Sequence, residues 1–317
     1  MKNDQTNITV IQPEELDRII DKFDSGYNNI PTSKPAVSLI TEKLEEAIDQ
    51  VEDIFYFVKR HTKLPLTEIK RTVFPIIQTA SEIPQFFHLF YQLQSADDYT
   101  YRHNIGVGVI ATLIGKWLSL PEDDLAELTI AATLHDIGKT KIPSEILNKP
   151  GKLTKAEYEI VKKHTIYGYE ILKNTDGISH KISVVALQHH EREDGKGYPF
   201  GLKGSKISYY SKIVAVADVF HAMSSNRVYH DATPFYQVIK QMNDDLFGKL
   251  DPTILVPFLQ QIMNALIGHH VLLTDGQIGR IKYINPYDLL SPLVEVSNTI
   301  IDLSVQKTIQ IERVLSD

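Results

Sequence analysis

The sequence places a histidine and an aspartate side by side, His135 and Asp136, within the stretch T-L-H-D-I-G-K. An imidazole nitrogen and a carboxylate oxygen can both ligate one transition-metal ion. Because a carboxylate has two oxygens, Asp136 could also bridge to a second ion. A helix carrying this pair would place Lys139, three residues later, on the same side, where an anionic substrate could meet the metal. Taken alone, the pair could equally be a polar helix end, so its interpretation depends on the rest of the chain.

The composition is that of a globular protein without thiol chemistry. The chain has 317 residues, of which 43% are hydrophobic, enough for two domains and a third small one. It contains no cysteine, which excludes disulfides, zinc–thiolate sites, iron–sulfur clusters and cysteine nucleophiles. Any metal must therefore be held by histidines and carboxylates, a ligand set that suits iron, manganese, zinc or nickel.

Charge and hydropathy argue against two further classes of protein, those that bind double-stranded nucleic acid and those that are secreted or span a membrane. The net charge is −7 and no basic run stands out, which argues against binding to double-stranded nucleic acid. The N-terminus lacks the apolar core of a signal peptide, and the most apolar stretch, residues 105–120, contains Lys116 and three glycines. We therefore expect a cytoplasmic protein without a membrane span.

Apolar residues that recur at intervals of three and four predict a mainly α-helical chain. Residues 1–95 carry a short helix near 13–23 and helices over 36–93, interrupted at Pro65. Residues 96–267 form the central helical region, with expected helices beginning near residues 97, 121, 154, 181, 208 and 236. We expect the helix after Pro121 to run into His135 and Asp136, a capping box of Thr154 and Glu157 to open a helix over 155–172, and Ser208 to cap the helix that follows it. Over residues 268–317 the period changes to that of a small antiparallel β module, opening with a hairpin at Asp275-Gly276.

Five further residues with metal-ligand side chains lie on or at the ends of the central helices. His103 lies on an apolar helix side, where a satisfied core histidine is the alternative, and His164 is followed four residues later by a glycine. Asp218 interrupts an apolar helix, and a buried carboxylate is normally paired or bound to a metal. Two adjacent histidines at a helix end point about 100° apart, so they could serve one ion or two. The five residues are His103, His164, His189, His190 and Asp218.

With His135 and Asp136 these residues make seven ligands, about what two six-coordinate ions require if Asp136 bridges and water completes the coordination. Two ions ~3.5–4 Å apart can deprotonate a bridging water and hold both non-bridging oxygens of a phosphoester. The constellation therefore predicts in-line hydrolysis of a phosphoester. Lys139 and Arg227 would neutralise the charge that develops on the phosphate.

A glycine-rich loop follows the histidine pair. Gly195, Gly197, Gly201 and Gly204, together with Pro199, exclude a helix interior and indicate a backbone that approaches another group closely. Tyr198 at its centre carries a phenol that could donate to a phosphate or stack on a base. A plain surface loop with a packing tyrosine is the alternative.

Five successive motifs resemble those of the HD-GYP domain, a branch of the HD phosphohydrolase superfamily. They read H-D-I-G-K-T-K-I-P, I-L-N-K-P-G-K-L-T, H-T-I-Y-G, H-H-E-R-E-D-G-K-G-Y-P and A-V-A-D-V-F-H-A-M, within residues 99–258. The resemblance implies an HD-type helical bundle with a binuclear or trinuclear iron or manganese site. It further implies hydrolysis of cyclic di-GMP to the linear dinucleotide pGpG, and often on to GMP. By position, the seven residues above would be metal ligands, Asp136 and Lys139 would be catalytic, and Lys139, Gly197, Tyr198 and Arg227 would contact substrate.

Two positions depart from the family pattern. Members with three metals tend to have a glutamate four residues before the first histidine, where this chain has Tyr99. We therefore expect two ions per chain, iron or manganese, with zinc or nickel as alternatives. Where the family usually has a basic residue three positions after the arginine, this chain has His230, so substrate contact there should be weaker.

Other functions are compatible with the same residues. The chain could hydrolyse another cyclic dinucleotide or nucleotide, act as a non-catalytic sensor or scaffold that docks a cyclase, or be a diiron oxygenase. The Gly-Tyr-Pro loop favours the HD-GYP enzyme over a generic HD enzyme, and the complete ligand set argues against a degenerate sensor. The expected partners are cyclic di-GMP or a related cyclic dinucleotide, and a second copy of the chain or a cyclase.

Overall fold

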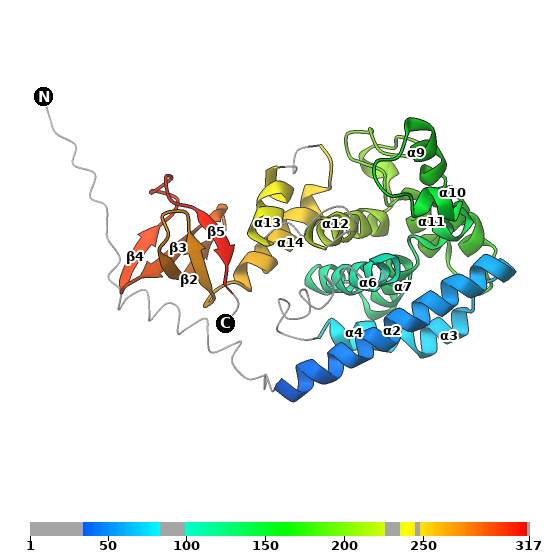
Figure 1. Ribbon diagram of the computed structural model, residues 1–317, viewed down its shortest axis with the longest axis horizontal. Helices are drawn as coiled ribbons and strands as arrows, with labels where there is room; N and C mark the ends of the chain where they lie inside the picture. The colour runs from blue at the N-terminus through cyan, green and yellow to red at the C-terminus, as the bar shows by residue number, and fades with distance from the viewer. Residues whose placement is uncertain (1–33, 83–98, 226–234, 245–247, 316–317) are drawn as a thin grey trace, which may run out of the picture.

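The computed structural model describes residues 34–82, 99–225, 235–244 and 248–315. Within them a helical bundle precedes one small sheet, so the expected fold class is confirmed (Figure 1). The helices are α2 (Lys34–His61), α3 (Leu66–Arg71), α4 (Val73–Ala80), α6 (Tyr99–Trp117), α7 (Glu122–Thr133), η1 (Ile137–Lys141), α8 (Ser144–Leu147), α9 (Lys155–Lys162), α10 (His164–Lys173), α11 (His180–Gln188), η2 (Gly204–Lys206), α12 (Tyr209–Ser224), α13 (Phe235–Asp244) and α14 (Pro252–Asn264). The strands are β1 (His270–Leu273), β2 (Ile278–Asn285), β3 (Asp288–Val296), β4 (Thr299–Asp302) and β5 (Ile311–Val314).

The N-terminal helices lie against the bundle that carries the candidate site. The long helix α2 packs on α4 and α6 (Figure 1). A bidentate ion pair joins α2 to α6, with Arg102 Nη1 and Nη2 lying 2.6 and 2.7 Å from the two carboxylate oxygens of Glu45. The break at Pro65 occurs as predicted, because α3 begins at the next residue. The expected helix at 13–23 and the last part of the helices expected over 36–93, residues 83–93, lie outside the described residues.

Two predicted helices end earlier than the sequence indicated. The helix that begins after Pro121 stops at Thr133, and His135 and Asp136 lie in the turn between α7 and the 3-10 helix η1. The capping box of Thr154 and Glu157 is present, but the helix it opens ends at Lys162, and α10 starts at His164. Both differences place a histidine at a helix junction, where backbone carbonyls are available to its ring.

The remaining helices form the core and connect it to the sheet. Ser208 caps α12 as predicted, its side chain accepting from the Ser211 N–H, and α12 packs on α6 and α11. The strand order is β4-β3-β2-β1-β5, and every pairing is antiparallel. The Tyr236 hydroxyl donates to the Leu290 carbonyl and joins α13 to β3.

The domain limits expected from the sequence, at about residues 95 and 267, remain predictions. None of the helices within the described residues is long and apolar enough to cross a membrane.

Candidate metal centre

Side chains from five parts of the helical bundle meet at one place in its interior. All seven predicted ligands lie there, and all except His190 are less than one-tenth exposed. They come from α6 (His103), the turn after α7 (His135, Asp136), the start of α10 (His164), the end of α11 (His189, His190) and the middle of α12 (Asp218). The predicted substrate residues Arg227 and His230 lie outside the described residues.

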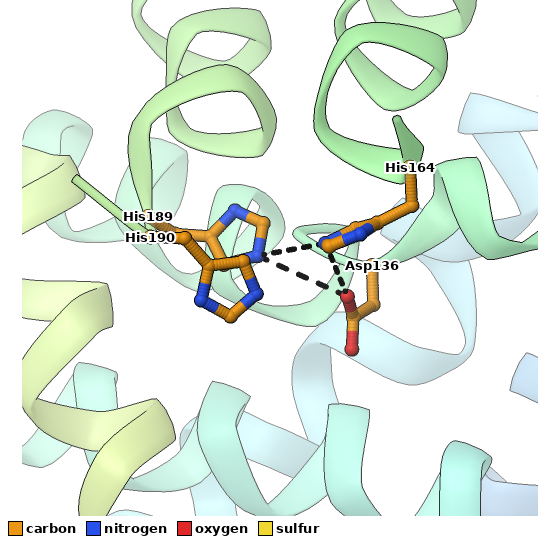
Figure 2. Close-up of side chains that lie close together, drawn as sticks. All are labelled: Asp136, His164, His189 and His190. Atoms are coloured by element: carbon orange, nitrogen blue, oxygen red, sulfur yellow. Dashed lines mark hydrogen bonds and ion pairs between the residues drawn. The ribbon is translucent and has the colours of Figure 1, made fainter. Parts of the chain in front are cut away.

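Asp136 stands between two groups of histidines and presents one carboxylate oxygen to each. Figure 2 shows the group that Asp136 forms with His164, His189 and His190. Its Oδ1 is 3.2 Å from His164 Nε2 and 3.8 Å from His189 Nε2. Its Oδ2 is 3.2 Å from His135 Nε2 and 3.9 Å from His103 Nε2. The possible ligand atoms form two groups, and within each group all of them lie within 4.8 Å of one another. One group contains His164, His189 and His190, the other contains His103 and His135, and Asp136 belongs to both. This is the placement expected of a carboxylate that bridges two ions.

Asp218 also faces both groups. Its Oδ1 is 3.1 Å from His103 Nε2, and its Oδ2 is 3.8 Å from His190 Nδ1. Burial alone would raise the pKa of Asp218, but the nearby His103 and His190 side chains help to hold it below its usual range. The second carboxylate of the cluster is therefore ionised and available to a cation.

The backbone decides which nitrogen three of the histidines present to Asp136. Because a carbonyl oxygen can only accept a hydrogen bond, each Nδ1 must carry the proton, and each Nε2 keeps its lone pair. These carbonyls lie at helix ends, where the last carbonyl oxygens have no intrahelical N–H donor and can accept from a side chain. The Nδ1-to-oxygen distances are 2.7 Å for His135 to Ala132, 2.7 Å for His164 to Val161, and 3.0 Å for His189 to Ala186.

The electrostatics favour a deprotonated site. Burial lowers the pKa of His103 and His164 and lowers that of His189 well below its usual range. Burial would raise the pKa of Asp136, but the charges of Lys139 and His135 hold it well below its usual range. For His135, the Asp136 carboxylate outweighs burial and raises the pKa. A metal ion would therefore meet an ionised carboxylate and mainly neutral imidazoles, the forms that ligate metals.

Two buried atoms of the cluster have no hydrogen-bond partner of good geometry within the described part of the chain, His135 Nε2 and Asp136 Oδ1. Buried polar atoms are normally satisfied, so these two atoms are available to bind a metal ion. The donors are imidazole nitrogens and carboxylate oxygens, the set that divalent transition metals prefer. The buried cluster therefore indicates binding of divalent metal.

The glycine-rich loop is held beside the cluster by a carboxylate that was not among the predicted site residues. Glu191 is 3% exposed, and its two oxygens accept the backbone N–H groups of Phe200, at 2.7 Å, and Leu202, at 2.8 Å. A Cβ at Gly197 would lie 2.4 Å from the His190 carbonyl oxygen, so glycine allows the loop to lie on the backbone of the histidine pair. Contact between Gly197 and substrate remains a prediction.

The Glu191 hydrogen bonds give a prediction that does not depend on activity. Each charge-assisted hydrogen bond contributes ~1.5–3 kcal/mol, so Glu191→Ala should raise hydrogen exchange at Phe200 and Leu202 at least about 10-fold. Metal content should not change, because Glu191 is not a ligand. Mass-spectrometric exchange measures the effect, with the exposed Glu170→Ala as the matched control. Unchanged exchange at both amides would show that Glu191 does not hold the loop.

Tyr198 lies over the cluster and extends it toward the surface. Its ring centroid is 4.6 Å from that of His190 and 6.3 Å from that of Tyr158. Lys162 Nζ lies 5.8 Å from the Tyr198 centroid and 5.5 Å from the Tyr158 centroid. Burial raises the pKa of Tyr198 far above its usual range, so its hydroxyl remains a donor. Tyr158 and Lys162 were not predicted; their spacing of four residues in the helix before His164 is the signal that could have found them.

A buried centre of imidazoles and carboxylates on several helices defines a helical metalloprotein. The sequence profile of the HD domain family matches residues 86–254, more than half of the chain, and the chain belongs to that family. The structure of Bd1817, an HDG"Y"P protein from Bdellovibrio bacteriovorus, superposes with a TM-score of 0.57 at 15% identity, covering 76% of this chain and 77% of that one. The expected membership of the HD family and the expected helical fold are thus confirmed.

Two curated relatives are cyclic-dinucleotide phosphodiesterases. Cyclic di-GMP phosphodiesterase PA4108 of Pseudomonas aeruginosa is 36% identical over 205 residues, covering 65% of this chain and 49% of that protein. The 3'3'-cGAMP-specific phosphodiesterase 3 of Vibrio cholerae is 37% identical over 168 residues, covering 53% of this chain and 36% of that protein. The matched region thus spans half or less of the length of these relatives.

Proposed function

We propose that this chain is a metal-dependent phosphodiesterase that hydrolyses cyclic di-GMP to pGpG, GMP or both at a binuclear centre. The observation that carries the proposal is the position of Asp136, with one oxygen toward each of two groups of histidines. The family and the relatives support the reaction class. Two bound ions would supply an activated water and a grip on the phosphoryl oxygens. Iron or manganese are the ions we expect.

Lys139 is suited to act on the phosphate. Its Nζ lies 2.5 Å from Asp136 Oδ2, and its side chain is 22% exposed, so it reaches from the carboxylate toward solvent. If a metal ion bound Asp136 in place of Lys139, the Lys139 ammonium would be free to contact a phosphate oxygen. Charge that develops on the phosphate during in-line attack would then be neutralised locally.

The Tyr198, Tyr158 and Lys162 side chains would bind the rest of the substrate. Tyr158 is 46% exposed, which leaves an aromatic surface for a purine base, since bases stack on aromatic rings with ~1–3 kcal/mol each. The Tyr198 hydroxyl would donate to a phosphate. This arrangement extends the predicted substrate contacts from the loop to α9.

One experiment tests the proposal directly. Protein loaded anaerobically with Fe²⁺ or with Mn²⁺ is incubated with cyclic di-GMP, and the products are separated by chromatography. We expect pGpG or GMP with the loaded protein and neither with protein stripped by a chelator. Full turnover by the stripped protein would reject the metal mechanism, and binding without product would favour a sensor or scaffold.

A second candidate substrate is 3'3'-cGAMP, because one relative is named as specific for it. The same assay run with both nucleotides at equal concentration decides between them through the ratio of kcat/KM. Association with a second copy of the chain or with a cyclase is a separate prediction, which light scattering of the purified protein and of the mixture tests.

Lys162 gives a prediction about substrate binding alone. A cation over two aromatic rings contributes about 0.5–2 kcal/mol, so Lys162→Ala should raise KM about 2–30-fold while kcat and metal content stay near wild type. The neighbouring Lys163→Ala is the matched control, because Lys163 is exposed and makes no contact with Tyr198 among the interactions described. Equal KM values for the two variants would remove Lys162 from the substrate site.

A further inference from the structure

His221 is a buried histidine beside the cluster that was not among the predicted ligands. It is 2% exposed, projects from α12, and places its Nδ1 3.1 Å from the Nδ1 of His103 on α6. The two ring planes make an angle of 64°. His221 belongs to neither group of ligand atoms around Asp136. It contacts the Nδ1 of His103, the ring nitrogen that does not face the carboxylates.

His103 differs from the histidines whose Nδ1 donates to a carbonyl at a helix end. It lies within the first turns of α6, and its Nδ1 faces an imidazole nitrogen. Its Nε2 is the nitrogen that faces the carboxylates, at 3.1 Å from Asp218 Oδ1. For Nε2 to ligate an ion, the ring proton must sit on Nδ1, which then needs an acceptor.

We propose that His221 is a positioning residue of the metal centre, whose Nδ1 accepts the Nδ1–H of His103 and so directs the Nε2 lone pair of His103 to the ion shared with His135 and Asp136. The inference rests on the proposed metal centre. His221 then carries its own proton on Nε2, since one nitrogen of the facing pair must donate and the other accept.

The surrounding chain is shaped to hold this ring. A Cβ at Gly106, one turn after His103, would lie 2.0 Å from His221 Nε2, so glycine at that position opens the space on α6 that the imidazole fills. The Ser225 hydroxyl, one turn after His221, lies 3.1 Å from His221 Nδ1 and 3.5 Å from Nε2. The space on α6 and the Ser225 hydroxyl at the end of α12 therefore fix the orientation of His221.

A matched pair of substitutions, His221→Asn and His221→Leu, distinguishes loss of the hydrogen-bond acceptor from a change in side-chain shape. In His221→Asn the Oδ1 atom is attached to Cγ, as Nδ1 is in histidine, and can accept the same hydrogen bond. In His221→Leu a methyl group takes that place and cannot accept. In His221→Asp the ionised carboxylate can accept but never donate, so this variant tests the direction of the hydrogen bond.

The readout is Mn²⁺ titration of the full chain, with free ion followed by electron paramagnetic resonance and folding by circular dichroism. Losing the partner of a ligating histidine weakens metal binding about 10–100-fold, which we expect for one of two ions in His221→Leu. His221→Asn should stay within about threefold of wild type, because one neutral acceptor replaces another. His221→Asp should bind at least as tightly as His221→Asn.

The outcomes are distinct. Equal affinity of the Leu and Asn variants, whether both normal or both weakened, overturns the role of His221 while leaving the metal centre in place. Weakened binding by His221→Asp overturns the direction of the hydrogen bond. If His221→Leu does not fold, the comparison of Asp with Asn decides the question. A wild-type chain that binds no Mn²⁺ would instead reject the proposed metal centre itself.

Discussion

Replacing Asp136 with alanine is expected to remove both ions of the proposed binuclear centre and to abolish the proposed phosphodiester hydrolysis. Asp136 is the residue common to both ligand groups, and its two oxygens lie within 3.2 Å of His164 Nε2 and His135 Nε2. The loss should exceed the ~10²–10³-fold caused by removing a single transition-state donor, because the ions and Lys139 would all lose their partner. Metal analysis and the cyclic di-GMP assay on one preparation measure both effects.

Two further variants make the test specific. Asp123→Ala, in the first turn of α7, removes an exposed carboxylate and should leave metal content and activity near wild type. Asp136→Asn keeps one carbonyl oxygen but no charge and should retain at most one ion per chain. Two ions and substantial turnover in the alanine variant would show that Asp136 does not bridge.

Replacing Gly138 with alanine should have the second largest effect, because it would separate the backbones that bring Asp136 and His164 together. A Cβ at Gly138, in η1, would lie 1.9 Å from the His164 carbonyl oxygen and 2.4 Å from the Gly168 nitrogen. Backbone atoms cannot turn aside as a side chain can, so α10 must move. Overpacking of this kind destabilises by about 3 kcal/mol, and we expect metal affinity to fall with it.

The measurements are chemical denaturation of the metal-free chain and Mn²⁺ titration of the folded one. Gly168→Ala is the graded control on the facing helix, since its Cβ would lie 3.1 Å from the Ala186 Cβ, a contact that a small shift relieves. The free energy of unfolding of Gly168→Ala should fall by about 1 kcal/mol or less. Wild-type stability and metal affinity in Gly138→Ala would show that the close contact of η1 with α10 does not position the site.

Much of the fold follows from local features of the sequence. The helical period over residues 36–82, the break at Pro65, the Ser208 cap and the Asp275-Gly276 hairpin each depend on neighbouring residues, and each is present. The predicted ends of two helices were wrong. The helix α7 stops at Thr133 instead of running into His135 and Asp136, and the helix predicted over 155–172 is divided between α9 and α10. At both places a histidine turns its ring to a carbonyl three residues back, a contact that periodicity alone does not reveal.

For the site, residue identity was enough to predict which side chains could ligate a metal, their order along the chain and the absence of thiol chemistry, since these depend only on which residues are present. Tertiary structure alone decided that Asp136 offers one oxygen to each histidine group, that Glu191 holds the loop, and that Lys162 lies over Tyr198. His221 makes the reason plain. It meets His103 across 118 residues of chain, and only the packing of α12 on α6 brings those two rings together.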